Sequence, residues 1–283
     1  MQQKHILVFA ALALLAGCKR MEAPPQTEEA GGGRLVSTAP NLTEIVFAIG
    51  AGELLVGRTD VCDYPPEVKR VPVVGGFGMP HLEPLLAARP THVLESAFAD
   101  PSVKSHLDAL GIPTVHVPCS RLDDIPRAIR QIGALTGREK EAEVLAERIE
   151  KVIGIEIHRG PDDPRVLLLF APDSTITAGG DTFVSELVYL WGGLNVAAGT
   201  GKGYFHVSLE WVVDQDPDII LCLFDTQGKD PASLFASRTG WKDLKAVRGG
   251  GVRTVANLDT VLRPGPRVLE GLEQLKKLLV SSF

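Results

Sequence analysis

An internal repeat constrains this chain more than any other feature of its sequence. The segment HLEPLLAARPTHVLE, which begins at His81, and the segment SLEWVVDQDPDIILC, which begins at Ser208, match without gaps at an offset of 127 positions. The offset places Glu83 opposite Glu210, and each copy has a proline at the same later position. Each copy predicts a short helix that opens with Leu-Glu, stops at the proline and is followed by an apolar strand.

The segments upstream of the two copies are also similar. RLVSTAPNLTEIVFAIG begins at Arg34, and RVLLLFAPDSTITAGGDTFVSELVYLWGG begins at Arg165. Both predict an apolar strand, an Ala-Pro turn, a helix and a glycine stop. The chain is therefore predicted to contain two similar α/β lobes.

The segment between the copies predicts one long amphipathic helix from Glu139 to His158. Its apolar residues recur at helical spacing, its opposite face is charged, and no glycine or proline interrupts it before Gly154. Twenty residues of helix span about 30 Å. We expect this helix to join the lobes, with an N-terminal lobe at 34–122, a helical connection at 123–159 and a C-terminal lobe at 160–283.

Strands alternate with helices in both lobes, which favours mainly parallel sheets covered on both faces. The predicted strands are 34–38, 54–58, 92–95, 114–117, 166–170, 194–196, 219–223 and 252–255. The predicted helices, apart from the middle one, are 42–49, 82–88, 102–110, 125–135 and 267–280.

The N-terminal segment has the pattern of an export signal. Residues 1–18 combine a basic start, an apolar run too short to span a bilayer and the ending Leu-Ala-Gly-Cys. This ending resembles the bacterial lipobox, in which Cys18 becomes the lipid-modified N-terminus; an ordinary signal with an incidental cysteine is the alternative. Residues 19–33 are rich in Pro, Glu and Gly and predict a flexible tether. We therefore expect an exported lipoprotein of the cell envelope that faces the periplasm or the exterior.

Charge and cysteine content exclude several classes of function. The net charge of −6 argues against a nucleic-acid partner, which would require a basic face. No CxxC pair is present, so neither a zinc ribbon nor a redox centre is predicted. An oxidising compartment would allow Cys62 and Cys119 to form a disulfide, although the sequence leaves this pairing open. Cys222 lies in an apolar run and is expected to be a buried thiol.

Enzyme motifs are absent from the sequence. It contains no GxSxG, no HExxH and no Walker A loop, and the segment GTGKGYF fails both the P-loop pattern and GxGxxG. The seven histidines lack metal-ligand spacing. His81 and His206 occupy near-equivalent places in the two lobes, but single histidines at helix starts are more often caps or surface groups than ligands. No catalytic residue and no metal site is predicted.

Several motifs together resemble a known family. RLVSTAPNLTE, GRTDVCDYPPEVKRVPVVGG, LEPLLAARPTHVLE, VSLEWVVDQDPDIIL and LRPGPRVLEGLEQL look like the solute-binding proteins of ABC importers for cobalamin and iron chelates. The resemblance covers about residues 34–283 and is greatest to the periplasmic vitamin B12-binding proteins, through TDVCDYPP and VSLE. It implies two lobes bridged by one helix, a ligand held between them, no enzymatic activity and no cofactor. The implied partners are a permease dimer with its ATPase subunits, and we expect a monomer that meets the membrane only through its lipid.

The resemblance also assigns a role to the paired glutamates. In the family, one glutamate at this position of each lobe pairs with arginines of the two permease subunits, which implies docking roles for Glu83 and Glu210. An acid in the first turn of a helix also complements the helix dipole, a contribution below about 1 kcal/mol. The two roles are compatible.

The expected ligand pocket is formed by loops that follow strands in the two lobes. The pocket residues are Asp60, Val61, Tyr64, Phe77, Met79, Phe98, Phe170, Tyr204, Phe205, Asp259 and Arg263. Phe77 and Tyr204 match aromatic positions of the cobalamin binders, whereas Val61 replaces a tyrosine. Aromatic walls with few fixed charges favour a corrinoid, and a ferric siderophore or haem is the alternative. An exported enzyme or a sensory or adhesion module on the same skeleton is less favoured, because no catalytic set appears and because the glutamates are paired.

Overall fold

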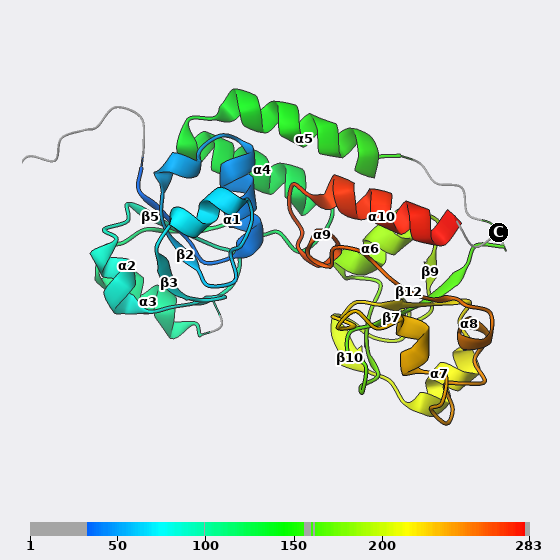
Figure 1. Ribbon diagram of the computed structural model, residues 1–283. Helices are drawn as coiled ribbons and strands as arrows, with labels where there is room; N and C mark the ends of the chain where they lie inside the picture. Colours follow the sequence, from blue (N-terminus) through cyan, green and yellow to red (C-terminus); the bar gives the residue numbers. More distant parts are fainter. Residues whose placement is uncertain (1–32, 99, 156–159, 161, 281–283) are drawn as a thin grey trace, which may run out of the picture. The chain divides into compact units, whose positions relative to one another are not determined.

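In the structure, the two copies of the sequence repeat belong to two different sheets. The computed structural model describes residues 33–98, 100–155, 160 and 162–280. The predicted signal with Cys18, almost all of the tether and the last predicted residues of the middle helix lie outside the described residues. The contacts divide the chain near residue 31, and all the described residues belong to the second unit. We call the elements from β1 to β6 the N-terminal lobe and those from β7 onward the C-terminal lobe (Figure 1).

The N-terminal lobe contains a six-stranded sheet of order β4-β3-β2-β1-β5-β6. All neighbouring pairs are parallel except β3 with β4, which pair antiparallel. The strands are β1 (Leu35–Ser37), β2 (Leu55–Thr59), β3 (Val73–Gly76), β4 (Met79–Pro80), β5 (His92–Glu95) and β6 (Thr114–His116). The helices are α1 (Pro40–Ala48), α2 (Leu82–Ala87) and α3 (Ser102–Ala109), with 3-10 turns η1 (Gly52–Leu54) and η2 (Pro66–Arg70).

The C-terminal lobe repeats the central part of this topology. Its four-stranded parallel sheet has the order β12-β11-β7-β9, and an antiparallel pair of β8 with β10 stands beside it. The strands are β7 (Arg165–Leu169), β8 (Ile176–Ala178), β9 (Leu194–Asn195), β10 (Tyr204–His206), β11 (Ile219–Cys222) and β12 (Val252–Thr254). The helices are α6 (Phe183–Leu190), α7 (Leu209–Gln215), α8 (Lys245–Arg248), α9 (Asp259–Leu262) and α10 (Val268–Val280), with a 3-10 turn η3 (Pro231–Leu234). The prediction of two α/β lobes with mainly parallel sheets is confirmed.

Helices α2 and α7 are equivalent in detail. From position 81 to 89 and from 208 to 216, every residue falls in the same class of buried, half-buried or exposed as its counterpart 127 positions away. Leu85 and Val212, which correspond, are both 0% exposed and anchor the helices to their sheets. A residue in the left-handed region follows each helix at the same place, Arg89 at φ 46° and Asp216 at φ 37°. The repeat in the sequence is therefore a repeat of backbone conformation and burial.

The connection between the lobes consists of two helices, α4 (Asp124–Thr136) and α5 (Glu139–Ile153), which pack side by side (Figure 1). Helix α5 has 15 residues, about 22 Å, and ends at Ile153 with Gly154 as its C-cap residue, whereas the sequence predicted helix through Gly154 and Ile155 as well. A side chain at Gly133 would place its Cβ 2.4 Å from that of Ala142, so the close approach of the two helices requires glycine there. Arg130 also joins the helices, because it pairs with both Glu143 and Glu150.

One hydrophobic core crosses from lobe to lobe. It contains buried residues of α1, α4, α5, α6 and α10 together with the sheet faces that these helices cover. Two smaller cores lie on the opposite faces of the sheets, one under α2 and α3 and the other under α7 and α8. Each sheet is therefore covered on both faces, as expected for parallel strands. Among the described residues, no helix is both long enough and apolar enough to cross a bilayer.

Candidate ligand-binding site

A cavity of about 530 Å³ is lined by residues of both lobes. In the N-terminal lobe its lining follows the carboxyl ends of the parallel strands, where open α/β sheets commonly bind ligands. The first residues of the equivalent helices α1 and α6 both contribute, so the two helix N-termini meet at the same space. The lining residues are Pro40, Asn41, Val61, Phe77, Ser96, Cys119, Ser120, Asp181, Thr182, Phe183, Tyr204, Leu262, Arg263 and Pro264.

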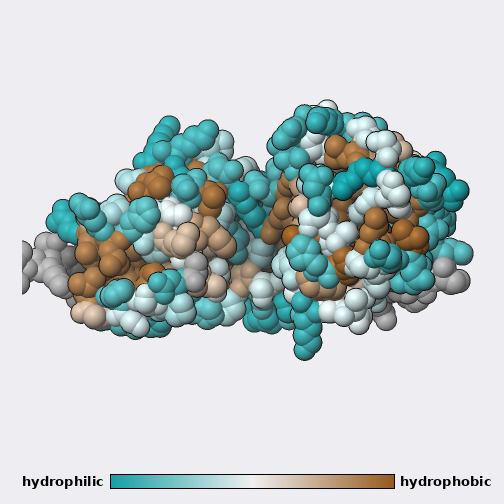
Figure 2. Space-filling model, turned by 90° about the horizontal axis from the view of Figure 1, so that it is seen from below, coloured by the Kyte–Doolittle hydropathy of each residue, from teal (hydrophilic) through white to brown (hydrophobic). Residues whose placement is uncertain are grey.

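Four of the predicted pocket residues line this cavity: Val61, Phe77, Tyr204 and Arg263. Phe77 and Tyr204 come from different lobes and are both exposed. Phe170 packs edge-on against Tyr204 with ring centroids 5.0 Å apart, so it supports the wall without lining it. In the space-filling view, apolar side chains gather in patches on both sides of a hollow (Figure 2).

The other predicted pocket residues lie outside the lining of this cavity. Asp60 and Met79 are exposed, Phe98 packs against the smaller core under α2 and α3, and Phe205 is half-buried. The ring of Phe205 lies close to Gly201, where an added Cβ would be 2.8 Å from a ring carbon.

Tyr64 and Asp259 also lie outside the lining but contact arginines of the loop beside it. The guanidinium of Arg267 stacks over the ring of Tyr64, 4.2 Å from its centroid. Asp259 pairs with Arg263 at 3.0 Å.

Arg263 is already surrounded by carboxylates. It contacts Glu44 at 3.2 Å and Asp63 at 2.7 Å, in addition to Asp259. The hydrogen bond from Arg263 lowers the pKa of Asp63 despite the opposing effect of partial burial. Arg263 therefore enters the cavity as a neutralised group rather than as a free cation.

Sequence reasoning missed the contribution of the loop at Pro264. The Pro264 carbonyl oxygen accepts a hydrogen bond from Asn41 Nδ2 at 3.1 Å and another from Cys119 Sγ at 3.0 Å. Two groups of the N-terminal lobe thus hold this loop of the C-terminal lobe in place. The only signal in the sequence was the Pro-Gly-Pro run itself, which predicts a turn but not its contacts.

The possible disulfide between Cys62 and Cys119 is not found, which corrects that expectation. Both are free and buried, as is Cys222. Cys62 Sγ lies 3.2 Å from Thr43 Oγ1 and 3.0 Å from Thr59 Oγ1, whereas Cys119 Sγ is engaged with Pro264. Burial raises the pKa of both Cys119 and Cys222 to about 12, so these two remain thiols at neutral pH.

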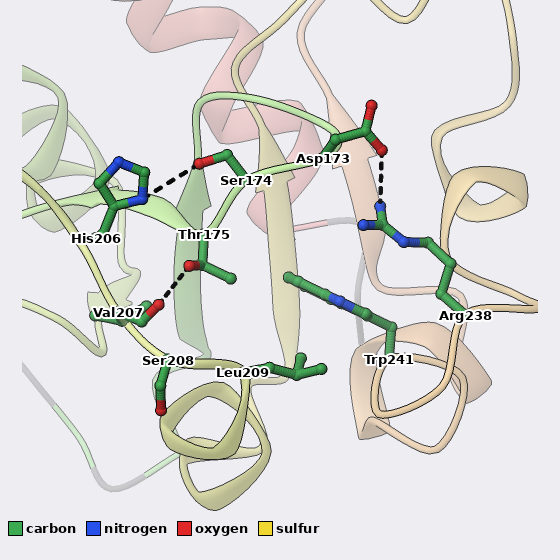
Figure 3. A pocket seen from close by; sticks show the side chains of 9 residues that line it. All are labelled: Asp173, Ser174, Thr175, His206, Val207, Ser208, Leu209, Arg238 and Trp241. Carbon is green, nitrogen blue, oxygen red and sulfur yellow. Dashed lines mark hydrogen bonds and ion pairs between the residues drawn. The ribbon is translucent and has the colours of Figure 1, made fainter.

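A second cavity, of about 520 Å³, lies in the C-terminal lobe beside the start of α7 (Figure 3). Its polar side chains are already paired with one another or with the backbone. Arg238 pairs with Asp173 at 3.8 Å and also donates to a backbone carbonyl, Ser174 Oγ lies 3.4 Å from His206 Nδ1, and Thr175 donates to the Val207 carbonyl (Figure 3). These groups of the second cavity therefore already have hydrogen-bond or ion-pair partners within the protein.

The two histidines considered at the sequence level do not form a metal site. His206 lines the second cavity, and His81 precedes α2 as its N-cap residue without a side-chain cap. Within the part of the chain that the structure describes, no group of three or more His, Cys, Asp or Glu side chains could hold a metal ion.

Glu83 and Glu210 are exposed in the first turns of α2 and α7. Neither makes an ion pair with another described residue. Hydrogen bonds to its backbone amide and to Ser208 lower the pKa of Glu210, so this side chain is a carboxylate at neutral pH. Both glutamates are therefore available to a partner.

Comparison with known proteins gives a consistent result. A family model described as "Periplasmic binding protein" matches residues 35–257. The chain is 31% identical over 247 residues to the vitamin B12-binding protein of Pectobacterium carotovorum, covering 86% of each chain. It is 32% identical over 254 residues to an uncharacterized ABC transporter substrate-binding lipoprotein of Bacillus subtilis, covering 86% of this chain and 78% of the other. Among solved structures, the apo periplasmic heme-binding protein of Roseiflexus sp. RS-1 matches with a TM-score of 0.76 and 28% identity, over 89% of this chain and 99% of that one.

Proposed function

This chain belongs to the periplasmic binding protein family, and on that premise we propose that it captures a corrinoid, cobalamin, for an ABC importer. The protein is an importer-type binding protein for vitamin B12, haem or a siderophore, and not an enzyme. Proteins of this family carry no cofactor and work with a permease and an ATPase. Membership of the family also implies an exported location, periplasmic or extracellular.

The observation that carries the corrinoid proposal is the chemistry of the cavity. Phe77 and Tyr204 bring aromatic faces from the two lobes, which suit a flat, nearly neutral macrocycle. Arg263 is balanced by Glu44, Asp63 and Asp259, so it offers little net positive charge to an anionic chelate.

One observation favours haem as the second candidate. Haem iron requires an axial ligand from His, Cys, Met or Tyr. The lining contains Tyr204 and Cys119, and the raised pKa of Cys119, about 12, makes its thiol a poor ligand. Tyr204 would then have to supply the ligand atom. The two haem propionates, however, would have to compete for Arg263 with the carboxylates that already pair with it.

A titration with cyanocobalamin, haem and ferric siderophores separates these candidates. We expect cobalamin to bind at micromolar affinity or tighter, about −8 kcal/mol. Tyr204→Phe keeps the aromatic wall but removes the phenol oxygen, so it should leave cobalamin affinity nearly unchanged and weaken any haem binding strongly. Tyr189→Phe, an exposed tyrosine outside the cavity, is the matched control. Tight binding of a ferric chelate with no cobalamin binding would overturn the ligand proposal and leave the importer role standing.

We propose in addition that Glu83 and Glu210 dock the protein on its permease. The support is their position: two exposed carboxylates occupy the same place on equivalent helices. A pseudo-symmetric protein with one such group in each lobe fits a permease dimer that presents one cation from each subunit. Charge pairs of this kind favour fast and selective association.

We also propose a lipid anchor at Cys18 and a division of the chain into two lobes with a helical connection. Cys18 at the end of the Leu-Ala-Gly-Cys motif would carry the lipid, residues 19–33 would form the tether, and a monomer would be held at the membrane by lipid alone. The lobes would extend over 34–122 and 160–283, with the connection between them. Cys18→Ser should release or misprocess the protein, and normal retention of this variant in the membrane fraction would contradict the anchor.

A further inference from the structure

We infer that each docking glutamate is one half of a charge–apolar pair, in which Leu86 accompanies Glu83 and Val213 accompanies Glu210. This inference rests on the proposed docking role of the glutamates and adds the chemistry of the surface around them. Each aliphatic residue follows its glutamate by three positions within the same helix. Side chains three apart on a helix are neighbours, with Cβ atoms about 5–6 Å apart. Each pair therefore forms one contiguous patch.

Exposure distinguishes the two aliphatic residues from the core residues beside them. Leu86 is 39% exposed and Val213 is 46% exposed, whereas the preceding residues, Leu85 and Val212, are 0% exposed. Leu86 and Val213 are also 127 positions apart, the offset that relates the two glutamates. Both copies of the repeat therefore have a solvent-exposed aliphatic side chain at the same position of the helix.

A single exposed aliphatic residue is ordinary on a protein surface and needs no explanation. The match is informative because the flanking residues differ in chemistry between the copies: Pro84 corresponds to Trp211, and Ala87 corresponds to Asp214. The glutamate and the aliphatic residue keep their character while these neighbours do not. A shared partner surface accounts for that pattern, because it would contact both patches.

The chemistry of the patch defines the partner. Each carboxylate would pair with one cation of the partner. Each aliphatic side chain would pack against one apolar group of the partner, about one helical turn away from that cation. A permease dimer would present this combination twice, once from each subunit. The apolar contact would exclude water from the edge of the ion pair, and ion pairs at interfaces are stronger when neighbouring contacts keep water out.

The test measures docking of the complete, lipid-bearing protein, purified in detergent, on its permease–ATPase complex in lipid nanodiscs. The variants are Leu86→Ser with Val213→Ser, and Glu83→Lys with Glu210→Lys. Val144→Ser is the matched control, because Val144 is an aliphatic residue on α5 that is 70% exposed. Affinity is measured from about 50 to about 300 mM salt, and cobalamin titration and thermal melting verify that each variant is folded.

We expect the double aliphatic variant to dock about tenfold more weakly while it keeps the salt dependence of the wild type. The charge-reversal variant should lose docking, and Val144→Ser should behave as the wild type. The single variants Leu86→Ser and Val213→Ser should have similar effects, because each removes one of two matched contacts.

Two outcomes would overturn the inference. If the aliphatic variant docks as well as Val144→Ser while charge reversal abolishes docking, the apolar half is wrong and the docking role of the glutamates stands. If neither double variant changes docking, the glutamates do not dock the protein, and the inference fails together with that role.

Discussion

Glu44 on α1 and Arg267 at the start of α10 form a two-point ion pair between the lobes. Arg267 Nε donates to Glu44 Oε2 at 2.8 Å, and Nη2 donates to Oε1 at 2.6 Å. The side chain of Glu44 is 1% exposed and that of Arg267 is 7% exposed, so the pair is almost free of water. Arg263 reaches the same carboxylate from the cavity side. The wall of the ligand site and the junction between the lobes therefore share one buried charge.

Glu44→Gln should destabilise the protein by about 3–5 kcal/mol, because it leaves buried guanidinium groups without their counter-charge. The free energy of unfolding in urea measures the loss. Asp108→Asn is the control, since it breaks the exposed Lys104–Asp108 pair and should cost less than about 1 kcal/mol. Equal effects of the two substitutions would show that the buried pair contributes no more than a surface pair does.

The ion pair of Asp63 with Arg263 should stabilise the folded protein to a degree that depends on pH. The hydrogen bond from Arg263 lowers the pKa of Asp63 below its value in the unfolded chain, about 3.9. The contribution is therefore present above that value and is lost as the pH falls through the folded-state pKa. The side chain is largely exposed, so the contribution should be below about 1 kcal/mol. Asp63→Asn should lower stability slightly at about pH 7, and the effect should shrink as the pH falls below about 3.9. A difference that grows toward acid would contradict this.

Phe77→Ala and Tyr204→Ala should each weaken cobalamin binding by about tenfold or more, because each removes an aromatic wall contributed by one lobe. Calorimetric titration measures the change. Met79→Ala is the comparison, since Met79 is exposed on the same hairpin as Phe77 but does not line the cavity. If Met79→Ala weakened binding as much as Phe77→Ala does, the ligand would contact a different part of the hairpin.

The three buried cysteines should be unreactive in the folded protein. Burial holds the pKa of Cys119 and Cys222 near 12, and thiols react through the thiolate. In the Cys18→Ser background at about pH 8, a thiol reagent should detect almost no fast-reacting group before denaturation and three after it. Detection of a single thiol after non-reducing denaturation would show that Cys62 and Cys119 are bonded.

The repeat allowed much of the fold to be predicted from the sequence. The strand at 92–95 has the predicted bounds, and α2 and α7 begin at their Leu-Glu pairs, because apolar periodicity and proline stops are local signals. The sequence predicts neither β8 nor β10, because the segment DSTITAGGDTF lies between the predicted Ala-Pro turn and the predicted helix. Its pairing with Tyr204–His206 is a tertiary contact that no local pattern specifies.

The candidate site was less accessible to sequence reasoning. The rule that ligands bind at loops after strands selected Val61, Phe77 and Tyr204, which line the cavity, although Tyr204 lies in strand β10 and not in a loop. Glu44 is absent from the residues that the sequence singles out, although an acid within an otherwise apolar helix indicates a buried partner. Its partners lie more than 200 positions away in sequence, so only the folded chain identifies them.

The hydrophobic core shared by the two lobes determines whether the lobes can unfold independently. Two similar lobes suggest two domains that each fold alone, yet Leu35 and Leu94 of one sheet belong to the same buried cluster as Val166 and Leu221 of the other. Separating the lobes would expose the faces of the helices that form this cluster. We therefore expect the whole described body to melt in a single cooperative transition, and either half expressed alone to lack a stable folded state.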